Sequence, residues 1–405
     1  MSSSPIAALE IGTTRTVLAV GELQHSGRIR VLGTAAIPTS GVRKSQIVDV
    51  SQASAAIVSA LKAIEETASV NVNIAMLVVN GPHIQSSESI GLCQLESNTV
   101  TENDVSEVRE KAQALAQAEH DTMTREVLQI FDLDFSVNDR PGILNPIGMS
   151  GQSLRHGVLA VHASKDALHD ASVAAGEAKL DIIEPVFAGY AASLAVLSPQ
   201  EMKEGVLLLD MGGGSTSYSV FCDGHMVHAG VIGVGGDHVT NDIAVAFNCN
   251  TNQAERLKRE YGSATIDASD ADKRADLPPS MPGADMRTIS VRALDTVINA
   301  RMSELFTIIL QNLDTGGFTH RLGSGVVLTG GGSALSNVEK LASRELGLAT
   351  RIGMPVNVDG LENADNPAAF ATIAGALVYC GESERTQMHG SFSDFLGKIF
   401  GRRQK

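Results

Sequence analysis

The chain has 405 residues, four Cys, no Trp, 43% hydrophobic residues and a formal net charge of −15. This length predicts two or three domains, with a core large enough to need no disulfide or metal to hold it. The acidic balance argues against nucleic-acid binding over most of the surface, and we expect no nucleic acid among the partners. The Cys residues lie far apart and form no C-x-x-C pair, which indicates reduced, mostly buried thiols.

The sequence also bears on the location of the protein. The N-terminus enters an apolar strand pattern with no basic region before it, so we expect no secretory signal. The longest mostly apolar stretch, 368–380, is well short of the ~20 residues that span a bilayer. We therefore expect an intracellular protein with no segment that crosses a membrane.

An internal repeat relates residues 9–20 to residues 209–220. Each copy reads as an apolar strand, an acid, a Gly-rich turn with hydroxyls and a second strand, which predicts a β-hairpin. The first copy carries the acid Glu10 and the turn residues Gly12, Thr13, Thr14 and Arg15. The second copy carries the acid Asp210 and the turn residues Gly212, Gly213, Gly214, Ser215 and Thr216.

The groups in these hairpins suit a metal-bound phosphate. Glycine lets the main chain approach phosphate oxygens closely, and successive N–H groups of a turn form a nest for anions. A carboxylate at the end of a strand holds Mg²⁺, usually through water, so Glu10 and Asp210 are the candidate metal-binding residues. A single glycine turn after an acid is common, but two matching copies predict a pair of turns that clamp a triphosphate from both sides.

Two further glycine clusters extend the candidate nucleotide site. One follows the predicted strand 325–329, opens a helical segment at 337–342 and consists of Gly330, Gly331, Gly332 and Ser333. A strand, a glycine turn and a helix N-terminus form a geometry that accepts nucleotide groups. The other cluster, with Gly235 and Gly236, enters an amphipathic pattern.

A charged pair, Glu255 and Lys258, lies beyond the second cluster, three residues apart on one face of a predicted helix. The pair either binds a ribose and an adenine edge or forms a surface ion pair, and both interpretations stay open. Other nucleotide folds are unsupported, because no G-x-x-x-x-G-K-[ST] occurs and no G-x-G-x-x-G opens a βαβ unit.

The C-terminal residues 391–405 predict an amphipathic helix, after a polar linker at 381–390. Large apolar side chains repeat at helical spacing and form one stripe: Phe392, Phe395, Leu396, Ile399 and Phe400. Four basic residues accompany a single Asp: Lys398, Arg402, Arg403 and Lys405. A helix of this length is about 22 Å long, so it is expected to lie in the interface of an anionic membrane. The alternative is a helix packed on the body of the protein.

These motifs together resemble the FtsA family of bacterial, actin-like cell-division proteins. Two phosphate hairpins and a G-G-G-S turn are shared by the actin/Hsp70/sugar-kinase superfamily. More specific pieces are GVRKSQIVD at 41–49, NPIGMSG at 145–151, GGDHVTNDI at 235–243 and AERLKREYG at 254–262. The resemblance covers nearly the whole chain and implies an α/β, actin-like fold with two duplicated, ribonuclease-H-like halves and an FtsA-type inserted subdomain.

The resemblance also implies a division of the chain. The expected parts are subdomain 1A at 1–82 and 164–199, the inserted subdomain 1C at 83–163, subdomain 2A at 200–237 and 322–385, subdomain 2B at 238–321, and a linker with a membrane-targeting helix at 386–405.

The function that the resemblance implies is that of a scaffold. The protein is expected to bind ATP or ADP with Mg²⁺, to polymerise head to tail, and to tether FtsZ to the inner face of the cell membrane at the division site. The FtsZ C-terminal peptide is expected on subdomain 2B, near a helix at 297–305 that carries Arg301 and Glu304. Other division proteins are expected as further partners. For Arg301, an ion pair within the domain remains open as the alternative.

Glu10 departs from the pattern of the family, which has Asp at this position. The extra methylene moves the carboxylate outward by about 1.5 Å. We therefore expect ATP binding to survive, with turnover that is slow at most. Glu184 is the candidate for orienting the attacking water, as in MreB-like relatives, and the alternative is an acid beside a Pro at the end of a strand.

Two other functions remain as alternatives. One is a small-molecule kinase of the same superfamily, for which residues 83–163 supply no obvious base or substrate pocket. The other is a PilM-like pilus-assembly protein, a relative in which neither the amphipathic tail nor the Asn-Pro-Ile-Gly-Met piece is expected.

Overall fold

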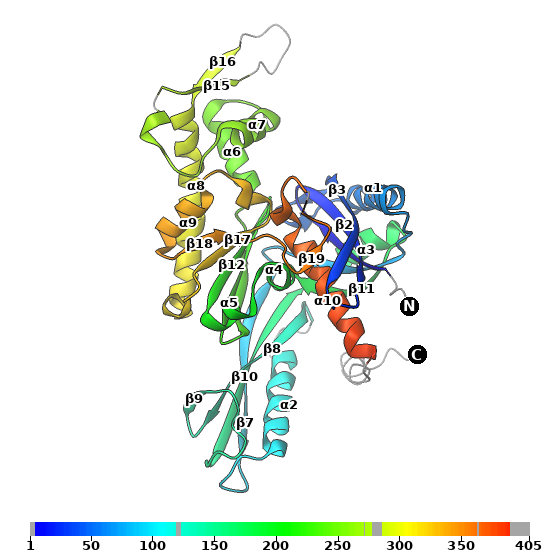
Figure 1. Cartoon of the computed structure of the whole chain (residues 1–405), viewed down its shortest axis with the longest axis vertical. Helices are drawn as coiled ribbons and strands as arrows, with labels where there is room; N and C mark the ends of the chain where they lie inside the picture. The colour runs from blue at the N-terminus through cyan, green and yellow to red at the C-terminus, as the bar shows by residue number, and fades with distance from the viewer. Residues whose placement is uncertain (1–4, 119–122, 271, 278–285, 363, 389–405) are drawn as a thin grey trace.

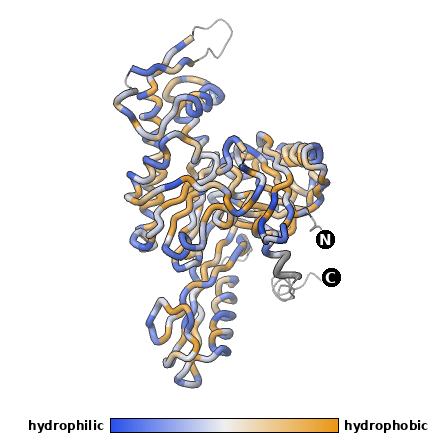
Figure 2. The backbone as a smooth tube through the Cα atoms, viewed as in Figure 1, coloured by the Kyte–Doolittle hydropathy of each residue, from blue (hydrophilic) through white to orange (hydrophobic). Residues whose placement is uncertain are grey.

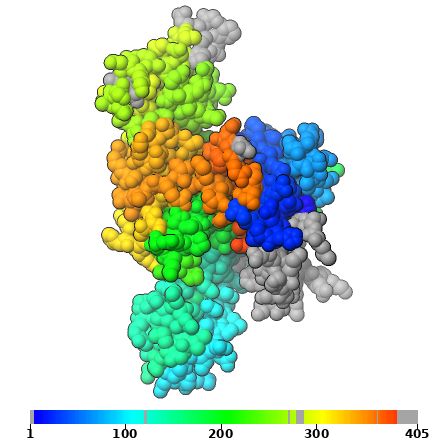
Figure 3. All heavy atoms as spheres, viewed as in Figure 1, coloured from blue at the N-terminus to red at the C-terminus, as the bar shows by residue number. Residues whose placement is uncertain are grey.

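The computed structural model describes residues 5–118, 123–270, 272–277, 286–362 and 364–388. Its centre consists of two lobes side by side, each built on one β-sheet (Figure 1). Two extensions project from opposite ends of this pair, one around residues 85–164 and the other around residues 236–290 (Figure 3). The membrane-targeting residues predicted from the sequence, from Phe392 to Arg403, lie outside the described residues.

The first lobe contains a six-stranded sheet. In spatial order its strands are β11 (Asp181–Phe187), β6 (Ile74–Val79), β1 (Ile6–Ile11), β2 (Arg15–Leu23), β3 (Ile29–Pro38) and β19 (Val358–Asp359). Strands β1, β2 and β3 form an antiparallel meander, whereas β6 and β11 run parallel to β1. Helices α1 (Val50–Ala68) and α3 (Lys165–Glu177) pack together on one face, and the Asp49 side chain caps α1 by accepting from the Gln52 N–H.

The second lobe repeats this topology. In spatial order its strands are β14 (His225–Ile232), β13 (Thr216–Cys222), β12 (Val206–Met211), β17 (Val326–Thr329) and β18 (Thr350–Ile352). Again the first three strands are an antiparallel meander, and the next two are parallel to the first. The predicted duplicated halves are therefore confirmed.

Two helices fill the space between the lobes: α4 (Ala188–Val196) and α10 (Ala371–Met388) pack against each other. Helix α10 contacts β1 and β2, and α4 contacts β12 and β13 as well as β11. The far face of the second sheet is covered by α8 (Val291–Thr315) and α9 (Val338–Leu346). Strand β12 is buried on both faces, which explains its unbroken apolar run before Asp210.

The insertion after β6 is a separate sheet with one helix. In spatial order its strands are β7 (Gln85–Gln94), β10 (Ser153–Ser164), β8 (Arg125–Val137) and β9 (Arg140–Ile143), and α2 (Glu102–Ala118) packs on it. Gly91 allows the close approach of α2, since a Cβ there would lie 2.4 Å from the Val108 carbonyl oxygen. The Asn-Pro-Ile-Gly-Met segment forms a turn in which the Met149 N–H donates to the Pro146 carbonyl at 3.0 Å and Gly148 has φ +82°.

The opposite extension leaves the second lobe after β14. It consists of α6 (Gly236–Phe247), α7 (Thr251–Tyr261), the 3₁₀ turn η1 (Ala268–Asp270), β15 (Arg274–Leu277), β16 (Arg287–Ser290) and the start of α8. Asn250 and Gln253 form a capping box at α7, and the Ser290 hydroxyl accepts from the Ala293 N–H at the start of α8. Smaller elements elsewhere are β4 (Val42–Arg43), β5 (Gln46–Ile47), α5 (Pro199–Glu204), η2 (Thr319–Arg321), η3 (Gly331–Ala334) and η4 (Pro367–Phe370).

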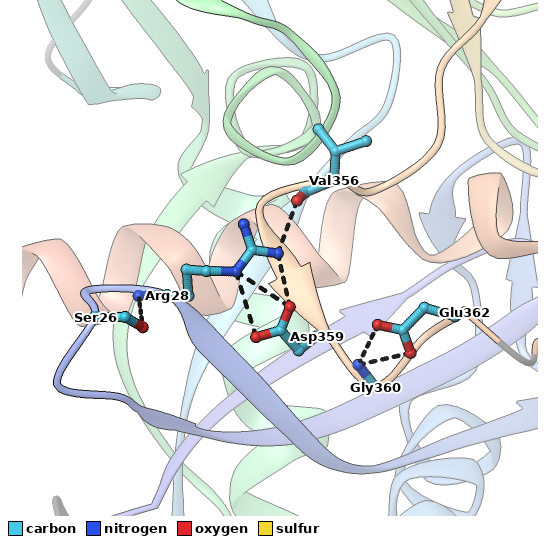
Figure 4. Close-up of polar contacts among 6 residues, drawn as sticks. All are labelled: Ser26, Arg28, Val356, Asp359, Gly360 and Glu362. Atoms are coloured by element: carbon cyan, nitrogen blue, oxygen red, sulfur yellow. Dashed lines mark hydrogen bonds and ion pairs between the residues drawn. The ribbon is translucent and has the colours of Figure 1, made fainter.

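A return of the chain ties the second lobe to the first. After β18, strand β19 joins the edge of the first sheet beside β3. Arg28, in the turn before β3, donates to both carboxylate oxygens of Asp359 and to the Val356 carbonyl at 3.0 Å (Figure 4). This cluster is exposed, so its charge pair adds little stability by itself, but it fixes the register of the crossing.

One predicted boundary differs in the structure. Helix α10 continues to Met388, so most of the polar linker predicted at 381–390 is helical. Its polar residues are mostly good helix formers, and they prolong a helix that the buried segment before them begins. The Gly330–Ser333 cluster leads into the short turn η3, and α9 begins at Val338, so the helical segment predicted at 337–342 is confirmed.

The strands of the two lobes are rich in buried hydrophobic residues (Figure 2). Among the residues that the structure describes, no helix combines the length and the apolar character needed to cross a bilayer.

Candidate functional site

The two predicted phosphate hairpins have the same register. Glu10 pairs with Val17 in the first, and Asp210 pairs with Ser217 in the second. The turns close in the same way: the Gly12 N–H donates to the Arg15 carbonyl at 3.1 Å, and the Gly212 N–H donates to the Ser215 carbonyl at 2.9 Å. The internal repeat in the sequence is therefore also a repeat in the structure, in which equivalent residues form equivalent hydrogen bonds.

The two turns face each other across the lobes and are in direct contact. A Cβ on Gly213 would lie 1.9 Å from the Thr14 hydroxyl oxygen, and a Cβ on Gly214 would lie 2.3 Å from the Thr13 hydroxyl oxygen. The absent side chains of these glycines thus make room for hydroxyls of the opposite turn. A phosphate chain between the turns requires that the turns separate.

The candidate metal-binding acids sit at equivalent ends of β1 and β12. Asp210 is 4% exposed, and burial together with the Glu10 charge raises the pKa of Asp210 to about 7. Burial also raises the pKa of Glu10, although its carboxylate accepts a hydrogen bond from the Thr372 hydroxyl at 2.7 Å. Two buried carboxylates, one of which disfavours the charge of the other, are suited to share a divalent cation.

Arg15 lies beside these acids, and its charge favours the ionised form of both. The guanidinium donates to the Ala369 carbonyl at 3.0 Å and lies 5.5 Å from the centre of the Phe370 ring. Arg15 therefore connects the first turn to η4, just before α10.

The Gly330 cluster closes the site from the side of Asp210. Gly330 has φ +81°, and a Cβ there would lie 2.4 Å from a carboxylate oxygen of Asp210. Gly331 approaches Arg15, Gly332 packs on Met211, and the Ser333 hydroxyl donates to the Gly330 carbonyl at 2.7 Å. The structure brings this third predicted cluster together with both hairpins.

The Gly235–Gly236 pair places the start of α6 on the second turn. The Gly236 N–H donates to the Gly212 carbonyl at 3.0 Å, and the Asp237 N–H donates to the Gly213 carbonyl at 2.9 Å. Thr216, just after the turn, donates from its hydroxyl to the Val234 carbonyl at 2.8 Å. The second turn and α6 are therefore held as one unit.

Glu255 and Lys258, on α7, form an ion pair of 2.6 Å. Both contact the Thr240 hydroxyl, which donates to Glu255 and accepts from Lys258, and Lys258 also donates to the Gly236 carbonyl. Burial acts against the charge of Glu255, but these hydrogen bonds outweigh it and lower the pKa of Glu255. Of the two interpretations of the pair, the structure shows the ion pair, and a nucleoside contact stays a prediction.

Glu184 lies in β11, two strands away from Glu10 in the first sheet. Burial raises the pKa of Glu184, and the Tyr379 hydroxyl of α10 donates to its carboxylate at 3.3 Å. A water-orienting role for Glu184 stays a prediction.

Arg301 and Glu304, on α8, lie in the extension away from the hairpins. Arg301 donates to Asp242 of α6, with its Nε 2.6 Å from the carboxylate, and also contacts Glu304. The structure thus shows the ion pair within the domain that the sequence left open for Arg301, and a peptide contact stays a prediction.

Three residues near the site were missed in the sequence. Ser45, between β4 and β5, contacts both turns; Asp237 receives a hydrogen bond from Thr14; and Thr372 binds Glu10. Burial raises the pKa of Asp237, and the Lys258 charge opposes that rise. The motif around 41–49 was the only sequence signal for Ser45.

Comparisons with known proteins agree with this architecture. A family model described as "Cell division protein FtsA" matches residues 207–375, and one described as "SHS2 domain inserted in FTSA" matches residues 81–162. A cell division protein FtsA of Pseudomonas aeruginosa is 30% identical over 97% of this chain and 93% of its own length. The FtsA of Escherichia coli K12 is 29% identical over 93% of this chain and 90% of its own length.

Solved structures share the fold. A PilM–PilN type IV pilus biogenesis complex matches with a TM-score of 0.65 at 18% identity, over 93% of this chain and 98% of the other. MreB5 of Spiroplasma citri bound to ADP matches with a TM-score of 0.54 at 14% identity, over 95% of this chain and 98% of the other. The doubled sheets and facing hairpins define an actin-like protein with an inserted subdomain. The chain belongs to the FtsA family of cell division proteins.

Proposed function

We propose that the protein is an ATP-binding, actin-like scaffold that polymerises on the inner face of the cell membrane and tethers FtsZ filaments there. The observation that carries ATP binding is the pair of hairpins with equal register, whose turns meet across the two lobes. Solved structures of actin-like neighbours bound to ADP and to AMPPNP support nucleotide binding by this fold. Membership in the FtsA family sets aside the kinase and PilM-like alternatives.

The residues present fit a nucleotide phosphate. Turn N–H groups, the hydroxyls of Thr13 and Ser215, and glycines without room for a Cβ form the donor set that phosphate oxygens use. In this proposal the nucleoside lies between the Gly330 turn, Gly236 and the Glu255–Lys258 pair. Because the turns touch, entry of the phosphates requires the lobes to move apart.

The residues also fit a hydrated Mg²⁺. Glu10 and Asp210 offer oxygen ligands, and the described residues contain no group of three or more His, Cys, Asp or Glu that could hold a metal. Phosphate oxygens and water would therefore complete the shell. The ion, when bound, offsets the charge of the phosphates and of the two acids. Glu184 would orient a water molecule, and Glu10 in place of the family's Asp would make the protein a slow ATPase at most.

The chain is proposed to divide as the resemblance implies, into subdomains 1A, 1C, 2A and 2B and a membrane-targeting tail. The tail at 391–405 combines an apolar stripe with basic residues, which together bind an anionic lipid surface. On subdomain 2B, Arg301 would receive an acidic group of the FtsZ C-terminal peptide. That peptide would replace Asp242 or Glu304 as a partner of Arg301.

One experiment tests nucleotide, membrane and polymer together: electron microscopy of the full chain with Mg-ATP on an anionic lipid monolayer. Filaments are expected on the anionic monolayer with ATP, and not on a neutral monolayer. Filaments that form equally well without nucleotide would contradict the role of the hairpins.

The tail has its own test by pelleting with anionic liposomes. Deletion of 391–405 is expected to abolish pelleting, and Phe395→Glu is expected to weaken it strongly by breaking the apolar stripe. Ser393→Ala, outside the stripe, is the matched control within the tail. Pelleting that persists after the deletion would show that the anchor lies elsewhere.

A further inference from the structure

A short hairpin of the first lobe reaches both phosphate turns. Strands β4 and β5 are joined by the two residues Lys44 and Ser45. The Ser45 N–H donates to the Thr13 hydroxyl at 2.9 Å, and the Ser45 hydroxyl lies 2.9 Å from the Ser215 hydroxyl. One residue therefore touches the first turn with its main chain and the second turn with its side chain.

The backbone at this tip is unfavourable for the residues that occupy it. Lys44 and Ser45 both have positive φ, of 49° and 60°. The two-residue hairpin turn at Asn138–Asp139 has the same signs of φ, as does the one at Asp223–Gly224. Those two turns use Asn, Asp and Gly, which tolerate this conformation, whereas Lys and Ser do so less readily. Strain of this kind persists where surrounding contacts fix the backbone, and ligand clamps are such places.

The groups that Ser45 presents match those of the two turns. It offers a main-chain N–H and a hydroxyl, and both now bind neutral hydroxyl oxygens. A phosphate oxygen is a charged acceptor and forms a stronger hydrogen bond than a neutral hydroxyl does. The neighbouring Arg43 and Lys44 are exposed and add positive charge beside the tip.

The position of the β4–β5 turn determines which end of a bound phosphate chain Ser45 would contact. Along the second turn, Gly213 lies against Asp237 at the start of α6, and Gly214 lies against Ser45. The proposed nucleoside side, with α6 and α7, is therefore at the Gly213 end, and the hairpin is at the far end. The outermost phosphate is the one that this geometry brings to Ser45.

We propose that Ser45 is a third phosphate-binding element, which binds the terminal phosphate of ATP through its N–H and hydroxyl when the two turns separate. This inference rests on the proposed binding of ATP and makes Ser45 the residue that distinguishes ATP from ADP. The tip has room to adjust, because a cavity of about 250 Å³ lies beside it, lined by Ser45, Ile11, Asn80 and His83 among others. Gly81 leaves space for the Ser45 carbonyl, which a Cβ would approach to 3.0 Å.

The test is a titration of the full chain with ATP and with ADP, in Mg²⁺, by calorimetry. Ser45→Ala removes the hydroxyl and is expected to weaken ATP binding by about tenfold, with less than about a twofold change for ADP. Ser45→Gly removes the same hydroxyl but relieves the positive φ, so it is expected to show the same loss for ATP with a higher Tm. Ser59→Ala, on the exposed side of α1, is the matched control and should change neither affinity.

The outcomes separate this inference from the proposed function. If the wild-type chain binds ATP and both Ser45 variants bind it equally well, Ser45 is not a phosphate ligand and ATP binding stands. An equal loss for ATP and ADP overturns the assignment to the terminal phosphate. A wild-type chain that binds neither nucleotide overturns the proposed function and this inference together. Should Ser45→Ala fail to fold, Ser45→Gly carries the test, because glycine adopts the native backbone without strain.

Discussion

Ser86 of the inserted subdomain holds Ala229 of the second lobe by both main-chain groups. The Ser86 hydroxyl donates to the Ala229 carbonyl at 2.6 Å and accepts from the Ala229 N–H at 3.3 Å. On its other side the insertion is fixed to the first lobe, where the buried Gln129 binds the main chain of Pro185 and Phe187. Strand β14 leads from Ala229 to Gly236, whose N–H donates to the Gly212 carbonyl of the second phosphate turn. Separation of the turns therefore acts on the base of the insertion.

Replacing Ser86 by Ala is expected to loosen this junction. Loss of two hydrogen bonds should lower the free energy of unfolding by on the order of 1 kcal/mol and speed amide hydrogen exchange at Ala229. Exchange measured by mass spectrometry on β14 peptides checks this, with Ser59→Ala as the control. Unchanged exchange in β14 would show that the junction is held by other contacts.

Gly235 is expected to tolerate no side chain. A Cβ there would lie 2.4 Å from the Gly213 carbonyl and 2.6 Å from the Gly212 carbonyl, both main-chain atoms that cannot turn away. Gly235→Ala should push α6 off the second turn, cost on the order of 1–3 kcal/mol of stability and weaken nucleotide binding. Gly176→Ala, on α3 with open space around it, is the matched substitution and should be neutral or stabilising. Equal denaturation midpoints for the two variants would contradict the expected crowding.

The contribution of Asp210 to the stability of the protein is expected to fall as pH rises from about 4 to about 7. The pKa of Asp210 lies at about 7 in the folded chain and at its ordinary value of 3.8 when unfolded. Between these values the folded state holds the proton that the unfolded state has lost, so the unfolded state gains as pH rises. Asp210→Asn should flatten this part of the Tm–pH curve. Glu10→Gln should move this fall in stability to lower pH, because the Glu10 charge that raises the pKa of Asp210 is removed. A curve for Asp210→Asn that still falls like wild type would rule out Asp210 as the titrating group.

Asp242 is expected to lower the affinity of the proposed peptide site, because it competes with the peptide for Arg301. Asp242→Ala removes one of the two acidic partners of Arg301 and should tighten binding of an FtsZ C-terminal peptide about three- to fivefold, measured by fluorescence anisotropy. Arg301→Ala should weaken binding, and in that background Asp242→Ala should bring no gain. Glu260→Ala, which breaks an exposed ion pair with Arg256 on α7, is the control. Weaker peptide binding by Asp242→Ala would mean that the Arg301–Asp242 ion pair only stabilises the folded domain and does not compete with the peptide.

Glu184→Ala is expected to reduce ATP turnover at least tenfold while ATP affinity changes little, if Glu184 orients water. Tyr379→Phe keeps the ring and removes the hydrogen bond to Glu184, so it should shift the pH profile of turnover to higher pH. Burial raises the pKa of Glu184, and the bond from Tyr379 opposes that rise. Phosphate release at steady state measures both effects, and equal turnover in Glu184→Ala would remove Glu184 from the reaction.

The paired hairpins could be predicted because each is local, with strand, acid, turn and strand inside a dozen residues, and because the copy at 209–220 repeats the one at 9–20. Contacts made across the chain could not be predicted. Thr372 and Glu10, which are hydrogen-bonded, lie 362 residues apart in the sequence, and Ser45 and Ser215 lie 170 residues apart. No local sequence pattern predicts contacts between residues so far apart. The partner of Arg301 could not be predicted for the same reason, because Asp242 lies on another helix.

Helix α10 begins one residue before Thr372, which binds Glu10, and ends at Met388, shortly before the proposed tail at 391–405. Eighteen helical residues make a rod of about 27 Å, and the first half of it is buried between the lobes. Where a flexible tether would absorb strain, a rod passes it on. Pull or torque on the C-terminal end of α10 would therefore reach the Glu10 carboxylate at the end of β1. With the tail bound to a membrane as proposed, mechanical load there would act on the first phosphate turn.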